Sequence, residues 1–211
     1  MSDINCMKKT LRQKLYRKRS QAFQEDQDTE AGAALKLILM ADPLFDQSLL
    51  ERNLQSTVIA GYIPIGSEID PRPLLNIFHE KGARLCMPEV IALDEPLKFR
   101  EWKPGDLLIS GALGTLQPLS KAALLVPDVM FLPLVGVDQK GVRMGQGGGF
   151  YDRTIAHYGK KDLLKIGVAF DAQMVDELPR ETHDEYLDGL ITPSLCKLWD
   201  EDRQARYLKQ A

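Results

Sequence analysis

The sequence lacks the features of a secreted or membrane-bound protein. Its 211 residues include only three cysteines, Cys6, Cys86 and Cys196, which are too few and too widely spaced for a zinc ligand set or a disulfide framework. We expect them to be buried thiols. No apolar run approaches the roughly 20 residues of a membrane-spanning helix, and the N-terminus lacks the apolar segment of a signal peptide. We therefore expect a cytoplasmic protein with no membrane partner.

An excess of positive charge is also missing. The formal net charge is −3 at pH 7, so the molecule has no broad cationic field of the kind that drives generic nucleic-acid binding. We expect no nucleic-acid partner, and any anion site must be local. The chain is 44% hydrophobic, enough to bury one sizeable core. With no internal repeat or linker, residues 1–211 are expected to form a single domain, as a monomer or, alternatively, a dimer.

The N-terminal segment combines an apolar stripe with a dense run of positive charge. Ile4, Met7, Leu11 and Leu15 recur at helical spacing, which predicts an amphipathic helix. Seven of the twelve residues from 8 to 19 are Lys or Arg, and acidic residues follow at once. The run is typical of a solvated helix face, although a helix that docks on RNA or on an acidic partner remains an alternative.

Beyond residue 56 the pattern alternates between short apolar runs and helical segments. The predicted helices are 30–40, 46–55, 71–82 and 150–158, and the predicted strands are 57–64, 84–90, 128–138, 164–170 and 188–193. Residues 97–118 are expected to form an edge hairpin with a Gly/Pro-rich loop. Such alternation predicts an α/β fold, with a mostly parallel sheet flanked by helices on both faces and a basic N-terminal helix.

The stretch RMGQGGGFYDR, residues 143–153, packs four glycines into the five positions 145–149, where a strand turns into a helix. Backbone N–H groups without Cβ atoms in front of them can cradle phosphate oxygens at a helix N-terminus. Arg143 adds a charged fork and Asp152 a carboxylate that could hold Mg²⁺ together with phosphates. The P-loop and dinucleotide patterns do not fit. A tight turn with positive φ angles is the structural alternative.

Residues 138–153 follow the pattern D-x-x-G-x-R-x-G-x-G-G-G-F-Y-D-R, and KKTLR, YIPIGSEIDPRPLL, FREWKPGD and LPRETHDEYLDGLIT stand around it in order. Over nearly its whole length the chain resembles the 5-formyltetrahydrofolate cyclo-ligase family, also called 5,10-methenyltetrahydrofolate synthetases. The resemblance implies an ATP- and Mg²⁺-dependent ligase of folate metabolism. Its reaction converts 5-formyltetrahydrofolate into 5,10-methenyltetrahydrofolate with release of ADP and phosphate.

The resemblance also assigns roles to residues. It implies catalytic roles for Arg143 and Asp152, and Mg²⁺ binding by Asp152 and Asp184. The ATP-binding residues would be Lys8, Arg12, Arg143, Gly145, Gln146, Gly147, Gly148, Gly149, Phe150 and Tyr151. The substrate-binding residues would be Ile63, Glu68, Trp102, Gln146, Gly147, Gly148, Gly149 and Phe150.

Several assignments stay open on the sequence alone. Many family members have a basic or aromatic residue where Gln146 stands and tyrosine where Phe150 stands, both beside the substrate. Trp102 could stack on the pterin or pack in the core, and His183 could support the site. A relative that acts on another phosphate-containing or folate-like substrate, such as a sugar phosphate or a CoA ester, and a non-catalytic binding module are the alternative functions.

Overall fold

The computed structural model describes residues 3–26, 54–159, 163–182 and 184–199. The predicted helix 30–40 and most of the predicted helix 46–55 lie outside these residues. The end of the latter, Leu54–Ser56, forms a short 3₁₀ helix, η3.

Eight of the described strands form the main sheet, in the order β13-β12-β10-β7-β1-β2-β3-β6. Its strands are β1 (Val58–Ala60), β2 (Arg84–Glu89), β3 (Lys98–Glu101), β6 (Leu124–Leu125), β7 (Val129–Pro133), β10 (Leu164–Val168), β12 (Gly189–Ile191) and β13 (Cys196–Leu198). The five strands from β12 to β2 are parallel, and the outer strands β13, β3 and β6 pair antiparallel. The predicted mostly parallel sheet is confirmed.

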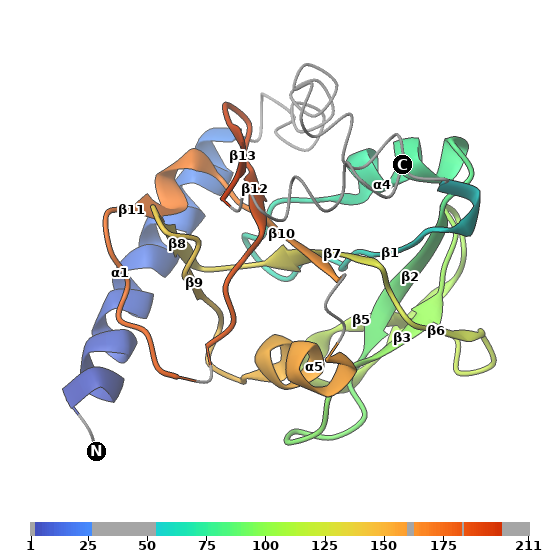
Figure 1. Ribbon diagram of the computed structural model, residues 1–211, viewed down its shortest axis with the longest axis horizontal. Coiled ribbons are helices and arrows are strands. Elements are labelled where there is room, and N and C mark those ends of the chain that lie inside the picture. Colours follow the sequence, from blue (N-terminus) through green and yellow to red (C-terminus); the bar gives the residue numbers. More distant parts are fainter. Residues whose placement is uncertain (1–2, 27–53, 160–162, 183, 200–211) are drawn as a thin grey trace.

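Helices cover both faces of this sheet, as predicted. α4 (Arg72–Glu80) lies on one face and α5 (Phe150–Tyr158) on the other (Figure 1). Successive strand residues point to opposite faces, so Ile59 packs in the core cluster that contains Phe78 of α4, whereas the next residue, Ala60, packs in the cluster that contains Ile155 of α5. The two cores make the sheet apolar on both sides, as parallel sheets require.

The long apolar run 128–138, predicted as one strand, is two strands in different sheets. After β7 the chain leaves the main sheet at Leu134 and Val135 and continues as β8 (Gly136–Asp138). β8 forms a small sheet with β9 (Arg143–Met144) and β11 (Met174–Val175). Gln173, at the end of the 3₁₀ helix η5 (Asp171–Gln173), donates from Nε2 to the carbonyls of Leu134 and Val135 at 2.7 and 3.3 Å, which fixes the bend.

The edge region 97–118 also divides into two parts. β3 joins the main sheet, while β4 (Leu108–Ser110) and β5 (Leu116–Pro118) form a separate two-stranded hairpin closed by the 3₁₀ turn η4 (Ala112–Gly114). The hairpin therefore lies beside the main sheet and does not extend its edge.

The N-terminal helix α1 (Asp3–Glu25) packs on the small sheet through Leu15, which is buried against Val135, Val142, Met144 and Leu178. The predicted apolar stripe is only half right, because Met7 is 60% exposed. The expectation that the cysteines are buried is also wrong for Cys6, which lies exposed on the same helix. The N-terminal half of α1 instead turns charged side chains inward.

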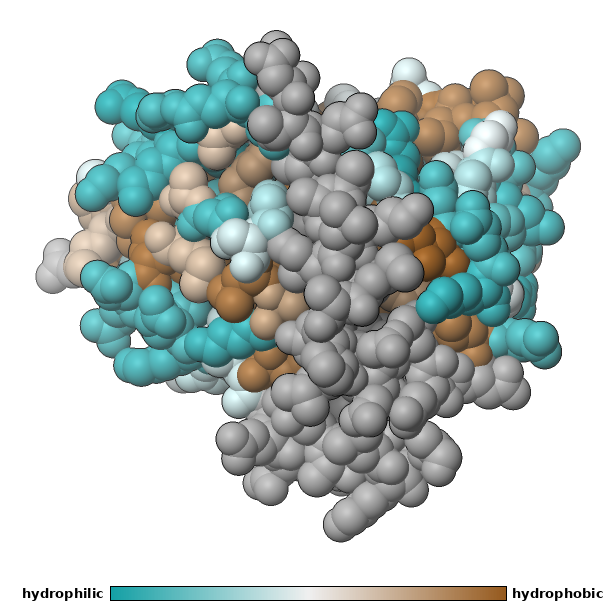
Figure 2. Space-filling model, turned by 90° about the horizontal axis from the view of Figure 1, so that it is seen from above, coloured by the Kyte–Doolittle hydropathy of each residue, from teal (hydrophilic) through white to brown (hydrophobic). Residues whose placement is uncertain are grey.

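The face shown in Figure 2 is mixed in polarity. In the view of Figure 2, hydrophilic side chains border several separate hydrophobic patches on the described part of the chain. Within the described residues, no helix has the length and apolar character that crossing a bilayer demands.

The strand order predicts where a ligand would bind. Numbered along the chain, the five parallel strands lie in the order 2-1-3-4-5, so the winding direction reverses between β1 and β7. Doubly wound sheets bind ligands outside the carboxyl ends of the strands at this reversal. Here the segment 64–70 follows β1, and the chain after β7 leads through β8 and β9 into the glycine stretch.

Candidate active site

One face of α1 lines the site along its length. Lys8, Arg12, Leu15 and Arg19 follow each other at spacings of four, three and four residues, which places them on one side of the helix. The three cations on this face reach three different parts of the site. Lys8 contacts the segment 180–186, Arg12 the glycine stretch, and Arg19 the segment after β1.

Lys8 is held between two carboxylates. Its Nζ donates to Glu181 Oε2 at 2.7 Å and to Asp184 Oδ2 at 2.5 Å. Burial lowers the pKa of Lys8, but the hydrogen bonds and the charges of Asp184 and Glu181 outweigh burial, so that the pKa is raised overall. Lys8 is therefore a fixed ammonium ion at neutral pH.

The glycine stretch is a backbone loop at the N-terminus of α5. Gly147 and Gly149 have φ angles of +103° and +66°, a region that side chains with a Cβ rarely adopt. Gly149 is the N-cap of α5 and supplies no side-chain capping bond, so the first N–H groups of the helix are open to an acceptor. Arg12 Nε donates to the carbonyl of Gly145 at 3.0 Å and ties α1 to this loop.

Arg153 braces the loop from its other side. Its Nη2 donates to the carbonyls of Gly148 and Leu93, each at 2.8 Å, and its guanidinium lies 5.1 Å from the centre of the Phe150 ring. The loop is thus held by an arginine at each end, Arg12 at Gly145 and Arg153 at Gly148.

Arg143 and Asp152 form an ion pair beneath the loop. Arg143 Nη2 donates to Asp152 Oδ1 at 2.8 Å, and the arginine side chain is only 4% exposed. Its buried Nε has no hydrogen-bond partner among the described residues, so the guanidinium keeps one donor for a further acceptor. Asp152 Oδ1 also accepts from the backbone N–H of Glu185 at 3.2 Å, so its carboxylate contacts the backbone of the residue that follows Asp184.

The carboxylates of Asp152 and Asp184 supply hard oxygen donors of the kind that Mg²⁺ uses. Within the described residues, no group of three or more His, Cys, Asp or Glu side chains could hold a metal by itself. Two carboxylates fit an ion that commonly takes one or two protein carboxylates and completes its shell with substrate phosphates and water.

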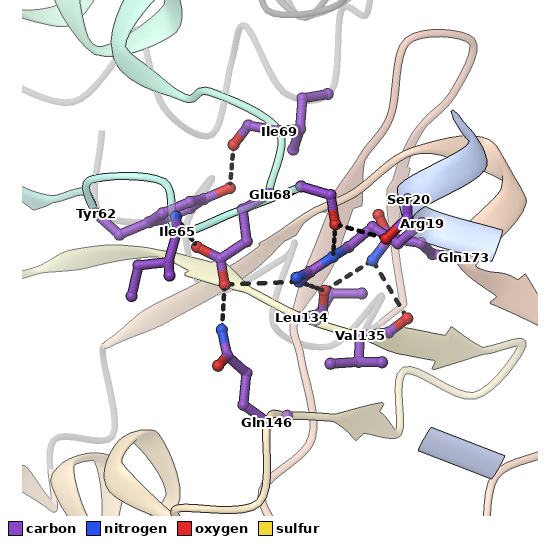
Figure 3. A network of polar contacts seen from close by, with 12 residues as sticks. Arg19, Ser20, Tyr62, Ile65, Glu68, Ile69, Leu134, Val135, Gln146 and Gln173 are labelled. Carbon is purple, nitrogen blue, oxygen red and sulfur yellow. Dashed lines mark hydrogen bonds and ion pairs between the residues drawn. The ribbon is translucent and has the colours of Figure 1, made fainter. Parts of the chain in front are cut away.

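Glu68 is the centre of a second group of contacts, on the β1 side of the site (Figure 3). Its side chain is 3% exposed. Gln146 Nε2 of the glycine stretch donates to Glu68 Oε1 at 2.6 Å, and the N–H of Ile65 donates to Oε2 at 2.9 Å. Arg19 Nη1 lies 3.6 Å from the same Oε1. The Glu68 carboxylate is therefore joined to both α1 and the glycine stretch.

Burial raises the pKa of Glu68 above its ordinary value of 4.5, although the Ile65 N–H, Arg19 and Gln146 all act in the opposite direction. Two tyrosines nearby stay neutral. Burial raises the pKa of Tyr62 and of Tyr151 well above the usual value, and the Glu68 charge raises each further.

Two predicted substrate residues do not line the phosphate side. Ile63 and Trp102 are 9% and 4% exposed and pack in the core cluster on the α4 face. The Trp102 Nε1 has no hydrogen-bond partner among the described residues. This position agrees with the packing alternative for Trp102. His183 lies outside the described residues.

Three residues escaped the sequence reasoning. Arg19 was expected on a solvated face but is 3% exposed, Glu181 shares Lys8 with Asp184, and Arg153 supports the loop. The position of Arg19 was available as a signal, since it lies eleven residues after Lys8 and so on the same face. Its neighbours in the sequence, such as Arg17 and Lys18, are exposed. Because Arg19 belongs to the same run of positive charge, the sequence did not distinguish it from them.

The comparison with known proteins decides the family. A model of the 5-formyltetrahydrofolate cyclo-ligase family matches residues 5–193. The chain belongs to this family. It is 32% identical over 148 residues to the 5-formyltetrahydrofolate cyclo-ligase of Mycolicibacterium smegmatis, covering 66% of this chain and 75% of that protein. It is 29% identical over 191 residues to the Escherichia coli cyclo-ligase, covering 88% of this chain and 100% of that protein.

The fold agrees as well. The NMR structure of Aquifex aeolicus 5,10-methenyltetrahydrofolate synthetase matches with a TM-score of 0.71 and 27% identity, and the match covers 92% of this chain and 94% of that chain. The family expected from the glycine motif is confirmed, and with it the expectation of a ligase that forms a C–N bond.

Proposed function

We propose that this cyclo-ligase family member converts 5-formyltetrahydrofolate and ATP into 5,10-methenyltetrahydrofolate, ADP and phosphate. The observation that carries the proposal is the hydrogen bond between Gln146 and Glu68. It joins the phosphate side of the site, built by the glycine stretch, to the carboxylate on the β1 side at 2.6 Å. A reaction that passes a phosphoryl group from one substrate to another needs two such sides in contact.

The phosphate side matches a polyphosphate. Lys8, Arg12 and Arg143 supply three cations around a glycine loop whose helix N-terminus has no side-chain cap. Charge-assisted hydrogen bonds from these groups would hold the ATP phosphates, and the loop N–H groups would bind the oxygens that the side chains leave free. The unpaired Nε of Arg143 is a donor with no other described use.

Asp152 and Asp184 would hold Mg²⁺, which neutralises charge on the phosphate oxygens and aligns them when it is bound. Within the protein, Asp152 pairs with Arg143 and Asp184 pairs with Lys8. The same four side chains therefore have two consistent sets of partners, one within the protein and one with the ligands.

The β1 side would take the folate. Glu68 would accept from N–H donors of the pterin, and the hydrogen bond between Glu68 and Gln146 supports a substrate position against residues 146–150. Phe150 and the exposed glycines of the loop border this space. Ile63 and Trp102 lie in the core on the α4 side of the sheet, and we propose that they support the pocket wall.

The formyl group on N5 needs activation because its carbon is a weak electrophile and its oxygen a poor leaving group. The formyl oxygen would attack the γ-phosphorus of ATP, which breaks the bond to ADP and gives a phosphorylated iminium. N10 then attacks the formyl carbon and gives up its proton, and the C–O bond breaks to release phosphate. Both reacting partners are substrates, so Arg143 and the loop act by positioning and charge stabilisation.

The structure gives less support to a non-catalytic module that binds through the whole basic helix. Of the seven cations between residues 8 and 19, Lys8, Arg12 and Arg19 are engaged within the fold. The other four, Lys9, Lys14, Arg17 and Lys18, are exposed, as expected of a solvated face.

The test is the near-ultraviolet absorbance of the methenyl product after the protein is mixed with 5-formyltetrahydrofolate, ATP and Mg²⁺. We expect a rise that requires ATP and is lost in Arg143→Ala. No rise in the wild-type protein, with ATP binding intact, would point to a relative that acts on another substrate.

A further inference from the structure

Arg19 is the most buried of the charged side chains on α1. It is 3% exposed, and several contacts hold its guanidinium. Nε donates to Ser67 Oγ at 3.1 Å and Nη1 to the carbonyl of Leu134 at 3.3 Å, while the Tyr16 ring lies 5.0 Å away. Burying a charged guanidinium costs free energy, so a buried arginine at this position calls for a functional explanation.

The contacts of Arg19 join the two segments between which the ligand crevice lies. Ser67 follows β1, and Leu134 follows β7, on the two sides of the point where the sheet reverses its winding. From this position Nη1 lies 3.6 Å from Glu68 Oε1, the oxygen that also accepts from Gln146 (Figure 3). Arg19 thus approaches Glu68 from the protein interior and leaves the loop side of the carboxylate to Gln146.

We propose that Arg19 is a positioning residue for the folate side of the site, which keeps Glu68 ionised and turned toward the glycine stretch. The proposal rests on the proposed function, in which Glu68 accepts from the folate substrate. Arg19 itself would touch neither substrate. Its effect passes through the carboxylate, and it belongs to the folate side although it stands on the same helix face as the phosphate-side cations Lys8 and Arg12.

Arg19 is the positively charged group that acts on the pKa of Glu68. Among the described groups that shift its pKa, burial acts upward and the Ile65 N–H, Arg19 and Gln146 act downward. Only Arg19 carries a full charge. The tyrosines that face it, Tyr16 from α1, Tyr62 after β1 and Tyr151 from α5, all have raised pKa values and stay neutral. Without Arg19, nothing described near Glu68 offsets its burial with positive charge.

The first experiment needs no activity. Carboxyl ¹³C NMR of the ligand-free protein follows the titration of Glu68 in the wild type, in Arg19→Met and in Arg17→Met, which removes an exposed cation from the same helix. We expect the pKa of Glu68 to rise in Arg19→Met, to return toward the wild-type value in Arg19→Lys and to stay unchanged in Arg17→Met. An unchanged Glu68 titration in Arg19→Met would overturn the proposal.

The second experiment measures kinetics. Arg19→Met should lower kcat/KM for 5-formyltetrahydrofolate by roughly tenfold, the loss expected for one buried charged contact, while KM for ATP changes less than about twofold. The acidic limb of the kcat/KM profile should move to higher pH, and Arg19→Lys should restore part of both. In a Glu68→Gln background, Arg19→Met should have little further effect, because its route through the carboxylate is already gone.

A purely structural role would give a different pattern. It would raise KM for ATP and for the folate together, leave the pH profile in place and persist in the Glu68→Gln background, and that pattern would overturn the proposal. Melting temperatures of all variants separate loss of folding from loss of positioning. If the wild-type protein forms no methenyl product, the proposed function fails, and the NMR titration still decides whether Arg19 controls Glu68.

Discussion

Lys8 Nζ lies 2.5 Å from Asp184 Oδ2, so a cation proposed for ATP is paired with a carboxylate proposed for Mg²⁺. Arg143 and Asp152 repeat the arrangement at 2.8 Å. Each pair satisfies two charged groups within the protein. We propose that each group exchanges its partner for phosphate oxygens or for a metal ion, so that the charges of the site need little rearrangement on binding.

Lys8→Met should weaken ATP binding selectively. We expect KM for ATP to rise by about tenfold, as for the loss of one charge-assisted contact, with KM for 5-formyltetrahydrofolate nearly unchanged. Lys9→Met is the matched control, because Lys9 is the next residue on the helix and is exposed. Steady-state kinetics with each substrate varied in turn measure both constants. Equal effects of the two substitutions would argue that only the general charge of α1 matters.

The role of Asp152 can be divided between charge and structure. Asp152→Asn keeps an acceptor for Arg143 and for the Glu185 N–H but removes the negative charge. It should sharply raise the Mg²⁺ concentration needed for activity and change the melting temperature little. Asp152→Ala should also destabilise the fold by about 3 kcal/mol, because it leaves the buried Arg143 guanidinium unpaired.

Mg²⁺ titrations and thermal melts of both variants check this division. Asp176→Asn, at an exposed aspartate, is the control. If Asp152→Asn needed no more Mg²⁺ than the wild type, Asp152 would be a partner of Arg143 and not a ligand of the ion.

Much of the fold could be predicted because parallel α/β proteins carry strong local signals. Helix α5 begins and ends where the pattern placed it, at Phe150 and Tyr158, since the glycines before it and Gly159 after it mark both ends. The run 128–138 was misjudged for a physical reason. β7 and the first two residues of β8 carry no charge, and nothing in the local sequence reveals that the bend at Leu134 is held by Gln173, 39 positions away.

The candidate site, too, could be predicted from the sequence only in part. The glycine stretch, Arg143 and Asp152 are close in the sequence, so their pattern was visible as a unit. Arg19 and Glu181 act through partners 49 and 173 positions away, Glu68 and Lys8. A charged residue at helical spacing looks the same in the sequence whether it faces solvent or a buried carboxylate, and only the packing of α1 against the sheet separates the two.

Glycine substitutions should separate backbone strain from ligand binding. Gly147 and Gly105 have φ angles of +103° and +91°, so alanine at either position should cost about 1 kcal/mol of stability. A Cβ at Gly147 would lie 3.4 Å from Arg12 Cζ and would fill the cradle, whereas a Cβ at Gly105 meets nothing within 4 Å. We expect Gly147→Ala, but not Gly105→Ala, to weaken ATP binding in calorimetry. Equal ATP affinity in the two variants would show that the loop does not bind the ATP phosphates.

The last prediction concerns pH. Glu68 should accept hydrogen bonds from the folate only when ionised, and burial raises its pKa above 4.5. As the pH falls, Glu68 is therefore protonated earlier than a surface glutamate, and kcat/KM for 5-formyltetrahydrofolate should decline at a pH where exposed carboxylates are still charged. The tyrosines that face it, Tyr16, Tyr62 and Tyr151, all have raised pKa values and stay neutral in this range.

Titration of the ATP phosphates could produce a similar decline, and two comparisons distinguish the sources. A phosphate effect would appear in kcat/KM for ATP and would survive in Glu68→Gln. An effect of Glu68 would appear in kcat/KM for the folate, would vanish in Glu68→Gln and would be unchanged in Glu80→Gln, which alters an exposed carboxylate. A folate profile that keeps its acidic limb in Glu68→Gln would show that another group binds the substrate, and the folate side of the site would have to be sought away from the Arg19 and Gln146 contacts.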